Sequence, residues 1–113
     1  MENKNIEILN RIKIRASEAI SDTKNMSYEE FLNDDKTIRA SIFSISQIGE
    51  SARLLDETIV SEYGDINWIE IRGLRNRIVH DYDGVQLKIV WRVIKENLPE
   101  LIIYVDRILK QIS

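Results

Sequence analysis

Apolar residues recur along this chain at spacings of three and four, the pattern that places side chains on one face of an α-helix. The first such stripe consists of Leu9, Ile12, Ala16 and Ile20. It predicts a helix over about residues 4–22. In the following "SYEE", Ser27 precedes Glu30 by three residues, which is the pattern of a capping box. This pair predicts the start of a short second helix that carries Phe31 and Leu32.

The longest apolar stripe begins just after Asp34 and Asp35, either of which can cap the N-terminus of a helix. Its members are Ile38, Ile42, Ile45, Ala52, Leu55 and Ile59, with Ile48 or Gly49 filling the gap. The pattern predicts one helix of about 28 residues, which would be about 42 Å long at 1.5 Å per residue. Gly64 stands where a glycine in the left-handed conformation is expected to end that helix.

A further helix is predicted over about residues 66–80, with Asp65 or Asn67 near its cap. The chain has only four glycines and one proline, and no long alternation of apolar and polar residues suggests a strand. With 113 residues, the sequence predicts one domain over residues 1–113. The expected fold is all-α, an up-and-down bundle of about five to six helices.

The last part of the chain predicts two helices, over about residues 85–96 and from Asn97 to about residue 112. Asn97 would cap the second of them, with Pro99 in its first turn. Two apolar stripes run along the first, about 150° apart. They consist of Leu87, Val90, Trp91 and Ile94, and of Val85, Ile89 and Val93. One stripe can face the core, so the other needs a partner, either another helix of the chain or a second subunit.

Composition narrows the classes of function. Apolar residues make up 43% of the chain and charged residues 31%, as in ordinary globular proteins. There is no cysteine and only one histidine, which excludes a disulfide framework, a thiolate zinc site and a histidine-rich metal site. The net charge of −3 argues against binding to nucleic acid through bulk positive charge, so any RNA site has to be local.

Two features bear on location. The polar start "MENKNIEILN" lacks the pattern of a secretory signal peptide. The longest apolar run, "LIIYV" at residues 101–105, is far too short to span a bilayer. The sequence therefore predicts no membrane association, with the cytoplasm as the default compartment.

The helix predicted over residues 66–80 carries an unusual polar face. Two of its faces hold the expected kinds of residue, Ile71, Leu74 and Ile78 toward the core and Glu70, Arg77 and Asp81 toward solvent. The third face holds Arg72, Asn76 and His80 at spacings of four, flanked by Arg75 and Tyr82. Gly73 lies inside the helix, where it costs about 1 kcal/mol relative to alanine. A second backbone approaching closely would explain that cost.

The residue types on this third face suit phosphate chemistry. Arginine holds phosphate through its planar fork, histidine exchanges a proton near neutral pH, and asparagine can orient the histidine or donate to a phosphoryl oxygen. They fit metal-independent cleavage of RNA, in which a 2′-OH loses its proton to a base and attacks the adjacent phosphate. Such cleavage also needs an acid, and a two-fold dimer would supply a second copy of His80. The plainer alternative is that arginine and histidine near a helix C-terminus only favour its dipole.

Three blocks of the sequence, in order, resemble the HEPN superfamily and, more closely, its HepT-like branch. "RNRIVHDY" at residues 75–82 reads as Arg-x4-His-x-Tyr with asparagine directly after the arginine, and lies in the central block over residues 64–85. "IGESA" at residues 48–52 and "IVWRVIKENLPELI" at residues 89–102 are similar to the other two blocks. The resemblance implies an all-α bundle that forms a homodimer, or a higher oligomer of dimers, with the Arg-x4-His motifs facing one another.

The same resemblance implies an activity and a mode of control. Arg75 and His80 would be the catalytic pair of an endoribonuclease toxin, supported by Asn76, with RNA as substrate and neither a metal nor another cofactor. The chain would belong to a type VII toxin–antitoxin system, in which an MntA-type nucleotidyltransferase antitoxin adds AMP to Tyr82. A bulky anionic group on Tyr82 beside Arg75 would keep RNA phosphate out. The alternative is a non-catalytic HEPN module that binds nucleotide or RNA and partners a minimal nucleotidyltransferase.

Two sets of charged residues leave alternatives open. Lys88, Arg92 and Lys95 fall on one helical face, which either follows an RNA backbone or is an ordinary solvated face. The candidate RNA-binding residues are Lys88 and Arg92 of this stripe, together with Arg72 of the polar face described above. Glu50 either supports the site by pairing with an arginine of the motif, or pairs with Arg53 or another surface group.

Overall fold

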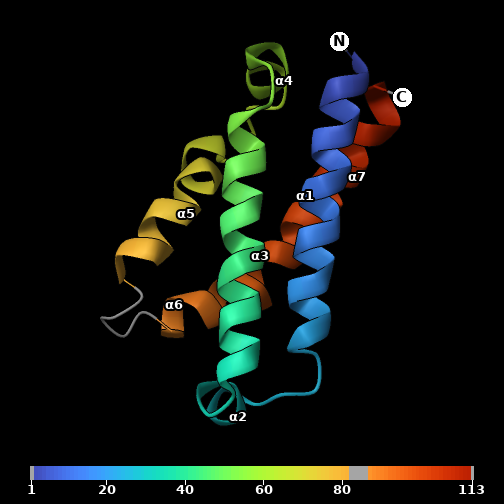
Figure 1. Ribbon diagram of the computed structural model, residues 1–113. Coiled ribbons are helices and arrows are strands. Elements are labelled where there is room, and N and C mark those ends of the chain that lie inside the picture. The colour runs from blue at the N-terminus through green and yellow to red at the C-terminus, as the bar shows by residue number, and fades with distance from the viewer. Residues whose placement is uncertain (1, 82–86, 113) are drawn as a thin grey trace.

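The computed structural model describes the backbone of residues 2–81 and 87–112, and the side chains of residues 4–74 and 87–112. The described chain is helical, without strands, so the all-α prediction is confirmed. In chain order its helices are α1 (Glu2–Asp22), α2 (Tyr28–Leu32), α3 (Asp35–Arg53), α4 (Glu57–Glu62), α5 (Trp68–Asp81), α6 (Leu87–Arg92), a π-helical segment (Val93–Asn97) and α7 (Leu98–Ile112) (Figure 1). None of the described helices combines the length and the apolar character that crossing a membrane requires.

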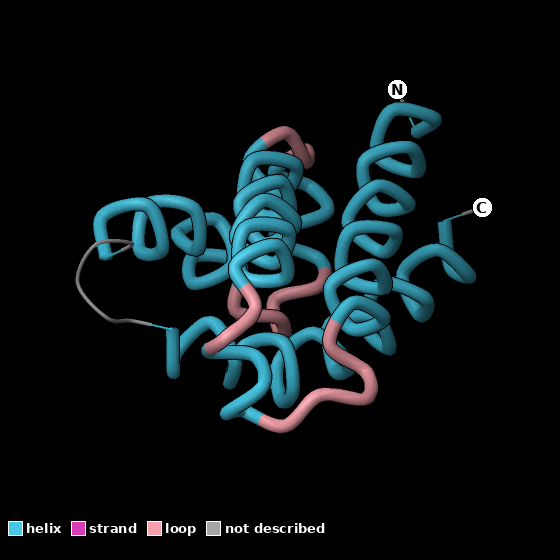
Figure 2. Tube along the Cα trace, turned by 60° about the horizontal axis from the view of Figure 1, so that its bottom comes forward, coloured by secondary structure: helices cyan, strands magenta, loops and turns pink. Residues whose placement is uncertain are grey.

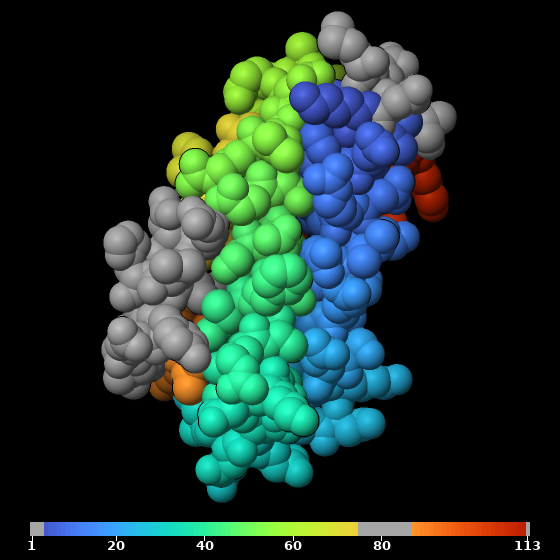
Figure 3. Space-filling model, in the orientation of Figure 1, coloured from blue at the N-terminus to red at the C-terminus, as the bar shows by residue number. Residues whose placement is uncertain are grey.

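α3 occupies the centre of the bundle. It packs against α1 on one side and α5 on the other, while α7 packs against α1 (Figure 1). The space-filling view shows α1 and α3 in contact along most of their length (Figure 3). The start of α1 and the end of α7 lie at the same end of the bundle in both views (Figures 1 and 2). Because α5 packs on α3, the helix that carries the polar motif is held by the middle of the core.

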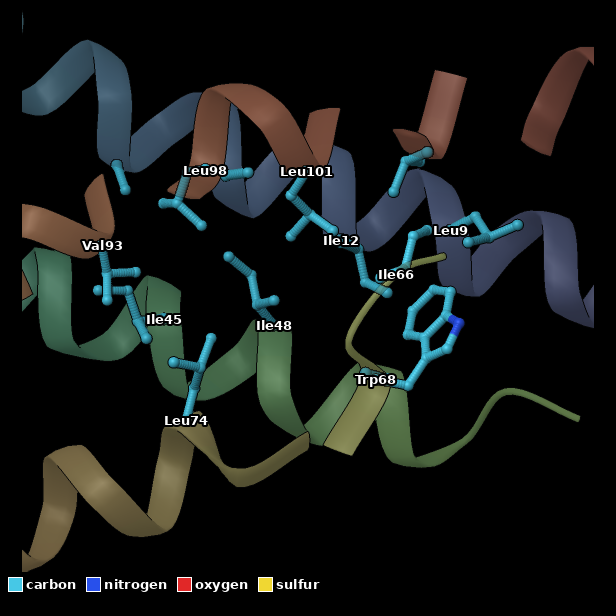
Figure 4. Packing of buried hydrophobic residues seen from close by; sticks show 14 of the residues in the cluster. Leu9, Ile12, Ile45, Ile48, Ile66, Trp68, Leu74, Val93, Leu98 and Leu101 are labelled. Atoms are coloured by element: carbon cyan, nitrogen blue, oxygen red, sulfur yellow. The ribbon is translucent and has the colours of Figure 1, made fainter. Parts of the chain in front are cut away.

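The core contains the apolar stripes that the sequence predicts. Leu9, Ile12 and Ala16 of α1 are fully buried, while Ile20 at the end of that stripe is only partly buried. They meet side chains from α3, α5 and α7, among them Ile45, Ile48, Leu74, Leu98 and Leu101 (Figure 4). Each fully buried leucine or isoleucine contributes about 1.5–3 kcal/mol through the hydrophobic effect. This burial holds the bundle together.

The predicted helix starts in the first half of the chain are confirmed. The backbone N–H of Glu30 donates to Ser27 Oγ at 3.1 Å, and that of Ser27 donates to Glu30 Oε1 at 2.8 Å, which completes the capping box of α2. Asp34 caps α3 by accepting from the N–H of Thr37 at 3.0 Å. Phe31 of α2 is buried, and its ring centroid lies 5.0 Å from that of Trp91. The small α2 thereby closes one end of the bundle.

The single long helix predicted up to Gly64 is wrong. α3 ends at Arg53, and α4 begins at Glu57. Between them Asp56 has an extended backbone, with φ −64° and ψ 146°. Asn5 of α1 fixes that conformation, because its Oδ1 accepts from the Asp56 N–H at 3.2 Å and its Nδ2 donates to Asp56 Oδ2 at 3.0 Å. A contact between residues far apart in sequence therefore replaces the helical hydrogen bonds at this point.

The end of α4 also differs from the prediction. The φ of Gly64 lies outside the left-handed region, so the expected left-handed glycine is not found. The Tyr63 N–H instead bonds to the Ile59 carbonyl at 3.0 Å, and the Tyr63 hydroxyl donates to Gln111 Oε1 of α7 at 2.6 Å. Burial, and then the neighbouring carboxylate of Glu62, raise the pKa of the Tyr63 phenol, so it stays a donor at neutral pH. The end of α4 is thus stabilised by these contacts of Tyr63 and not by a left-handed glycine.

The break predicted at Asn97 is wrong as well. Residues 87–112 are helical throughout, and the N–H of Leu98 bonds to the Val93 carbonyl five residues back. Pro99 explains this wider π turn, because proline has no N–H and its ring clashes with the carbonyl four residues back in a regular α-helix. The chain bends instead of stopping, so α7 continues from α6 without a cap (Figure 1).

The two apolar stripes predicted before this bend both pack inside the chain. Val90, Ile94 and Val93 are buried, and Leu87, Ile89 and Trp91 pack partly buried against the core. Val85 lies outside the described residues. Of the two partners considered for the second stripe, other helices of the same chain therefore cover the members that the structure describes.

Candidate functional site

α5 begins at a well-defined point, which fixes where the motif falls along it. Of the two predicted caps, Asn67 is the one used, since its Oδ1 accepts from the Glu70 N–H at 3.1 Å and its Nδ2 donates to Glu70 Oε2 at 3.3 Å. The buried indole of Trp68 donates from Nε1 to the Tyr63 carbonyl at 3.0 Å. The first turn of α5 is therefore anchored to the end of α4.

The core-facing side of α5 is as predicted where the structure describes it. Leu74 is buried and lies toward Ile45 and Ile48 of α3 (Figure 4), and Ile71 is partly buried against the same core. This contact sets the rotation of α5 about its own axis. The opposite side of the helix is thereby turned away from Ile45 and Ile48.

The motif itself lies in the last turns of α5. Arg75, Asn76 and His80 belong to its helical backbone, while their side chains, like those of Arg77, Ile78 and Asp81, lie outside the described residues. Tyr82 lies outside them altogether. The roles of Arg75, Asn76, His80 and Tyr82 therefore stay predictions.

The N-terminal half of the motif's face is open. At about 100° per residue, Ile69, Gly73, Asn76 and His80 take positions within about 60° of one another around α5. Ile69 is 88% exposed. A Cβ added at Gly73 would meet no other atom of the described chain within 4 Å. The close approach of a second backbone predicted at Gly73 is thus not found among the described residues, and the face offers room for one from outside.

Arg72, a predicted RNA contact, is already engaged within the protein. Its Nε donates to the Ala52 carbonyl at 3.0 Å, and its Nη2 donates to the Leu55 carbonyl at 3.5 Å. Its Nη1 lies 3.4 Å from Glu57 Oε1, and the side chain is only 24% exposed. These carbonyls lie where α3 breaks, so Arg72 ties α5 to the junction between α3 and α4. Its contact with RNA stays a prediction.

The predicted basic stripe, which runs from α6 into the π-helical segment, contains residues with different contacts. Lys95 Nζ donates to the Thr23 carbonyl at 2.8 Å and lies 4.6 Å from the centroid of the Trp91 ring, so its charge is held against the protein. Arg92 Nε lies 4.0 Å from Glu96 Oε2 in an exposed pair, which contributes at most about 0.5 kcal/mol. Lys88 is exposed. All three residues of the stripe are exposed, so each remains accessible to RNA, although Lys95 also bonds to the Thr23 carbonyl.

Glu50 lies on the central helix near the polar contacts of α5. Its Oε1 is 4.0 Å from Arg53 Nε, which is one of the pairings the sequence allows. Its predicted pairing with an arginine of the motif concerns side chains outside the described residues. The supporting role of Glu50 therefore stays a prediction.

A cavity of about 170 Å³ lies on another side of α5, between this helix and α7. Its floor is apolar and includes Ile71, Leu74, Val93, Leu98 and Leu101. Its rim carries the carboxylates of Asp65, Glu70 and Glu100. Carboxylates repel phosphate, so this cavity does not suit an RNA backbone. Among the described residues, no three or more histidine or acidic side chains are grouped to hold a metal ion.

The sequence did not predict the hydrogen bonds that Asn5 and Arg72 make to the junction between α3 and α4. Asp56 followed by Glu57 is the local signal that was available, because aspartate favours the residue before a helix start. The partners of the junction are Asn5 and Arg72, which lie 51 and about 17 residues away along the chain. Helical periodicity contains no information about such distant partners.

The open space at Gly73 leads to a test. In the dilute, monomeric chain, Gly73→Ala should raise the free energy of unfolding by up to about 1 kcal/mol, because alanine favours the helix interior and its methyl group meets no neighbour within the chain. Urea denaturation measures the change, with the exposed Ser17→Ala in α1 as a control for helix propensity alone. A loss of stability in Gly73→Ala beside a normal Ser17→Ala would show that this space is not open.

A model of the family described as Ribonuclease HepT-like matches residues 5–108 of the chain. A protein of Methanocaldococcus jannaschii named "Putative RNase" is 33% identical over 91 residues, which cover 80% of this chain and 75% of that protein. One of the same name from Caldanaerobacter subterraneus is 34% identical over 92 residues, covering 81% and 82%. The "Probable ribonuclease HepT" of Thermococcus cleftensis is 32% identical over 79 residues, covering 70% and 72%. No solved structure matches the chain.

Proposed function

Because the chain belongs to the HepT-like ribonuclease family, we propose that it is a metal-independent endoribonuclease that cuts RNA with Arg75 and His80. The observation that carries this proposal is the match over residues 5–108, which includes the whole Arg-x4-His motif. Its relatives named as ribonucleases support the same activity. The helical backbone of α5 places Asn76 directly after Arg75 and one turn before His80.

The proposed reaction begins at a 2′-OH of the RNA. A neutral His80 takes the proton of this hydroxyl, whose oxygen attacks the adjacent phosphate. The bond to the 5′-oxygen breaks, and that oxygen takes a proton from an acid, leaving a 2′,3′-cyclic phosphate and a 5′-hydroxyl. Arg75 stabilises the extra negative charge on the phosphoryl oxygens as it develops. Asn76 orients the imidazole or donates to the phosphate.

We further propose that two copies of the chain assemble this site. Arg75 and His80 are five residues apart, which is about 140° around α5, so the two side chains start on different sides of one helix. A second copy supplies the histidine that acts as acid while the first acts as base. The exposed Ile69 and the open space at Gly73 support this arrangement, because a facing helix would cover both.

Control of the activity is proposed to act on Tyr82. An MntA-type nucleotidyltransferase antitoxin would transfer AMP from ATP to the tyrosine hydroxyl and release pyrophosphate, as in a type VII toxin–antitoxin system. Tyr82 follows His80 by two residues, so the added phosphate would lie close to the cleavage residues. Its negative charge would compete with RNA for Arg75.

The second candidate is a HEPN module that binds nucleotide or RNA and partners a nucleotidyltransferase without cutting. The net charge of −3 and the engagement of Arg72 within the protein favour it, since both reduce the positive charge available to RNA. It differs from the first candidate in having no turnover. Measuring cleavage therefore separates the two.

His80→Ala should abolish cleavage of RNA in the presence of a chelator while the helical signal and melting temperature stay near those of the parent. Loss of a general base costs about 10²- to 10⁴-fold in rate. Gel electrophoresis of a fluorescent RNA after incubation with parent, His80→Ala and Arg75→Ala measures it. Cleavage by His80→Ala at the parent rate would contradict its assignment, and binding without cleavage by the parent would favour the second candidate.

Incubation with an MntA-type nucleotidyltransferase and ATP should add AMP to the peptide that contains Tyr82, and should stop RNA cleavage. Mass spectrometry of the digested chain locates the added group. Tyr82→Phe is the control, because it removes the accepting hydroxyl and keeps the ring, so it should stay unmodified and active. An unmodified Tyr82, or AMP on another residue, would disprove the proposed control.

A further inference from the structure

We propose that Arg72 is a positioning residue for RNA cleavage, which sets the register of α5 against α3 and so places Arg75, Asn76 and His80. The inference rests on the proposed ribonuclease function and adds a residue to it. It also gives Arg72 a different task from the RNA contact that the sequence suggests.

The anchor that Arg72 binds is the broken end of α3. Backbone carbonyls at the end of a helix have no partner within the helix and need one from elsewhere. The Leu55 carbonyl, just past the end of α3, accepts from Arg72 Nη2 at 3.5 Å. The Ala52 carbonyl accepts from Arg72 Nε at 3.0 Å and also from the Leu55 N–H at 3.4 Å. Glu57, at the start of α4, lies 3.4 Å from Nη1. All three guanidinium nitrogens therefore face the same junction.

The junction is itself held from a second direction. Asn5 of α1 bonds to both the backbone N–H and the carboxylate of Asp56, at 3.2 and 3.0 Å. Asn5 is buried and Asp56 is exposed, so this contact is partly shielded from solvent. Arg72 thus bonds to a junction whose position is also restricted by Asn5 of α1.

A planar guanidinium with two directed bonds restricts α5 in a way that a single donor would not. The Nε and Nη2 bonds together fix both the rotation of α5 and its position along its axis, whereas a lysine ammonium would act as one point charge. Arg75 and Asn76 follow Arg72 by about one turn, and His80 by about two. An error of 1 Å in the placement of catalytic groups can lower a rate about 10²-fold.

The surroundings of Arg72 disfavour a direct contact with phosphate. Its side chain is 24% exposed, and the Glu57 carboxylate beside it offsets its charge. An arginine that binds an RNA phosphate contributes to the salt dependence of affinity, whereas a positioning arginine changes the rate. The two roles therefore predict different measurements.

The first experiment compares the parent with Arg72→Gln, Arg72→Lys and the control Arg39→Gln, which changes an exposed arginine of α3. Single-turnover cleavage at saturating RNA should fall about 10- to 100-fold in Arg72→Gln, and less in Arg72→Lys. The RNA affinity and its slope against salt should match those of the parent and of Arg39→Gln. A slope lower by about one with the rate intact would overturn the proposal in favour of a phosphate contact.

The second experiment reads the register of α5 without using activity. The chain has no cysteine, so spin labels can be placed on Glu70→Cys of α5 and Phe43→Cys of α3, both exposed positions away from the face assigned to the second copy. In labelled chain diluted with unlabelled chain, the distance between the two spin labels should have one narrow distribution. This distribution should broaden or shift in Arg72→Gln, and in Arg72→Lys it should lie closer to that of the parent. Arg72→Lys keeps a cation for Glu57 and so serves even where Arg72→Gln does not fold.

The outcomes separate the two proposals. A parent that cuts no RNA overturns the proposed function and the catalytic part of this inference together. A parent that cuts RNA, with a distance unchanged by Arg72→Lys and Arg72→Gln, overturns the positioning role alone. A changed distance with an unchanged rate also overturns it, because the register of α5 would then not control cleavage.

Discussion

The hydrogen bonds at the junction between α3 and α4 determine how the rest of the bundle is arranged. Asn5 holds Asp56 in an extended conformation, which stops one long helix from forming, and Arg72 donates to the carbonyls of Ala52 and Leu55 beside this break. α4 then turns away, and the chain returns along α3 as α5 (Figure 1). Hydrogen bonds to a charged donor are worth about 1.5–3 kcal/mol, so the junction is a substantial part of a marginal stability.

This arrangement gives α5 two sides with opposite properties. One side packs Leu74 on α3 and borders a cavity whose rim is acidic, which does not suit RNA. The other side carries the exposed Ile69, the unobstructed Gly73 and the positions of Asn76 and His80. Under the proposed function, the net acidic chain would bind RNA phosphate through a few directed positive groups, Arg75 above all, in place of a broad basic surface.

Local chemistry made much of the fold predictable. The capping box at Ser27 and the cap at Asp34 depend on residues three positions away, and the apolar stripes of α1 depend on helical spacing alone. The break at Asp56 was not predictable in this way, because Leu55 and Ile59 keep the spacing of one helix and the cause is a contact with Asn5. The π turn at Val93 was missed for a related reason, since Pro99 suits both the first turn of a new helix and a widened turn within one.

The candidate site remains a prediction from the sequence. The helical projection puts Asn76 and His80 on one face with Arg75 flanking it, and the catalytic roles come from the resemblance of the motif to a known family. Arg72 shows the limit of projection: it shares a face with these residues, yet its guanidinium turns back to Ala52 and Leu55. A helical wheel gives the direction in which a side chain leaves the helix and does not give its partners.

The chemistry of the cut ends tests the central claim most directly. Attack by the 2′-OH, with His80 as base, leaves a 2′,3′-cyclic phosphate and a 5′-hydroxyl on an RNA cut in the presence of a chelator. Mass spectrometry of the fragments identifies these ends, and a 2′-deoxy nucleotide at the cut position should block cleavage. Fragments with a 3′-hydroxyl and a 5′-phosphate would contradict the account. So would cleavage at the bond that follows the 2′-deoxy nucleotide. In both cases attack by water would replace attack by the 2′-OH of the RNA.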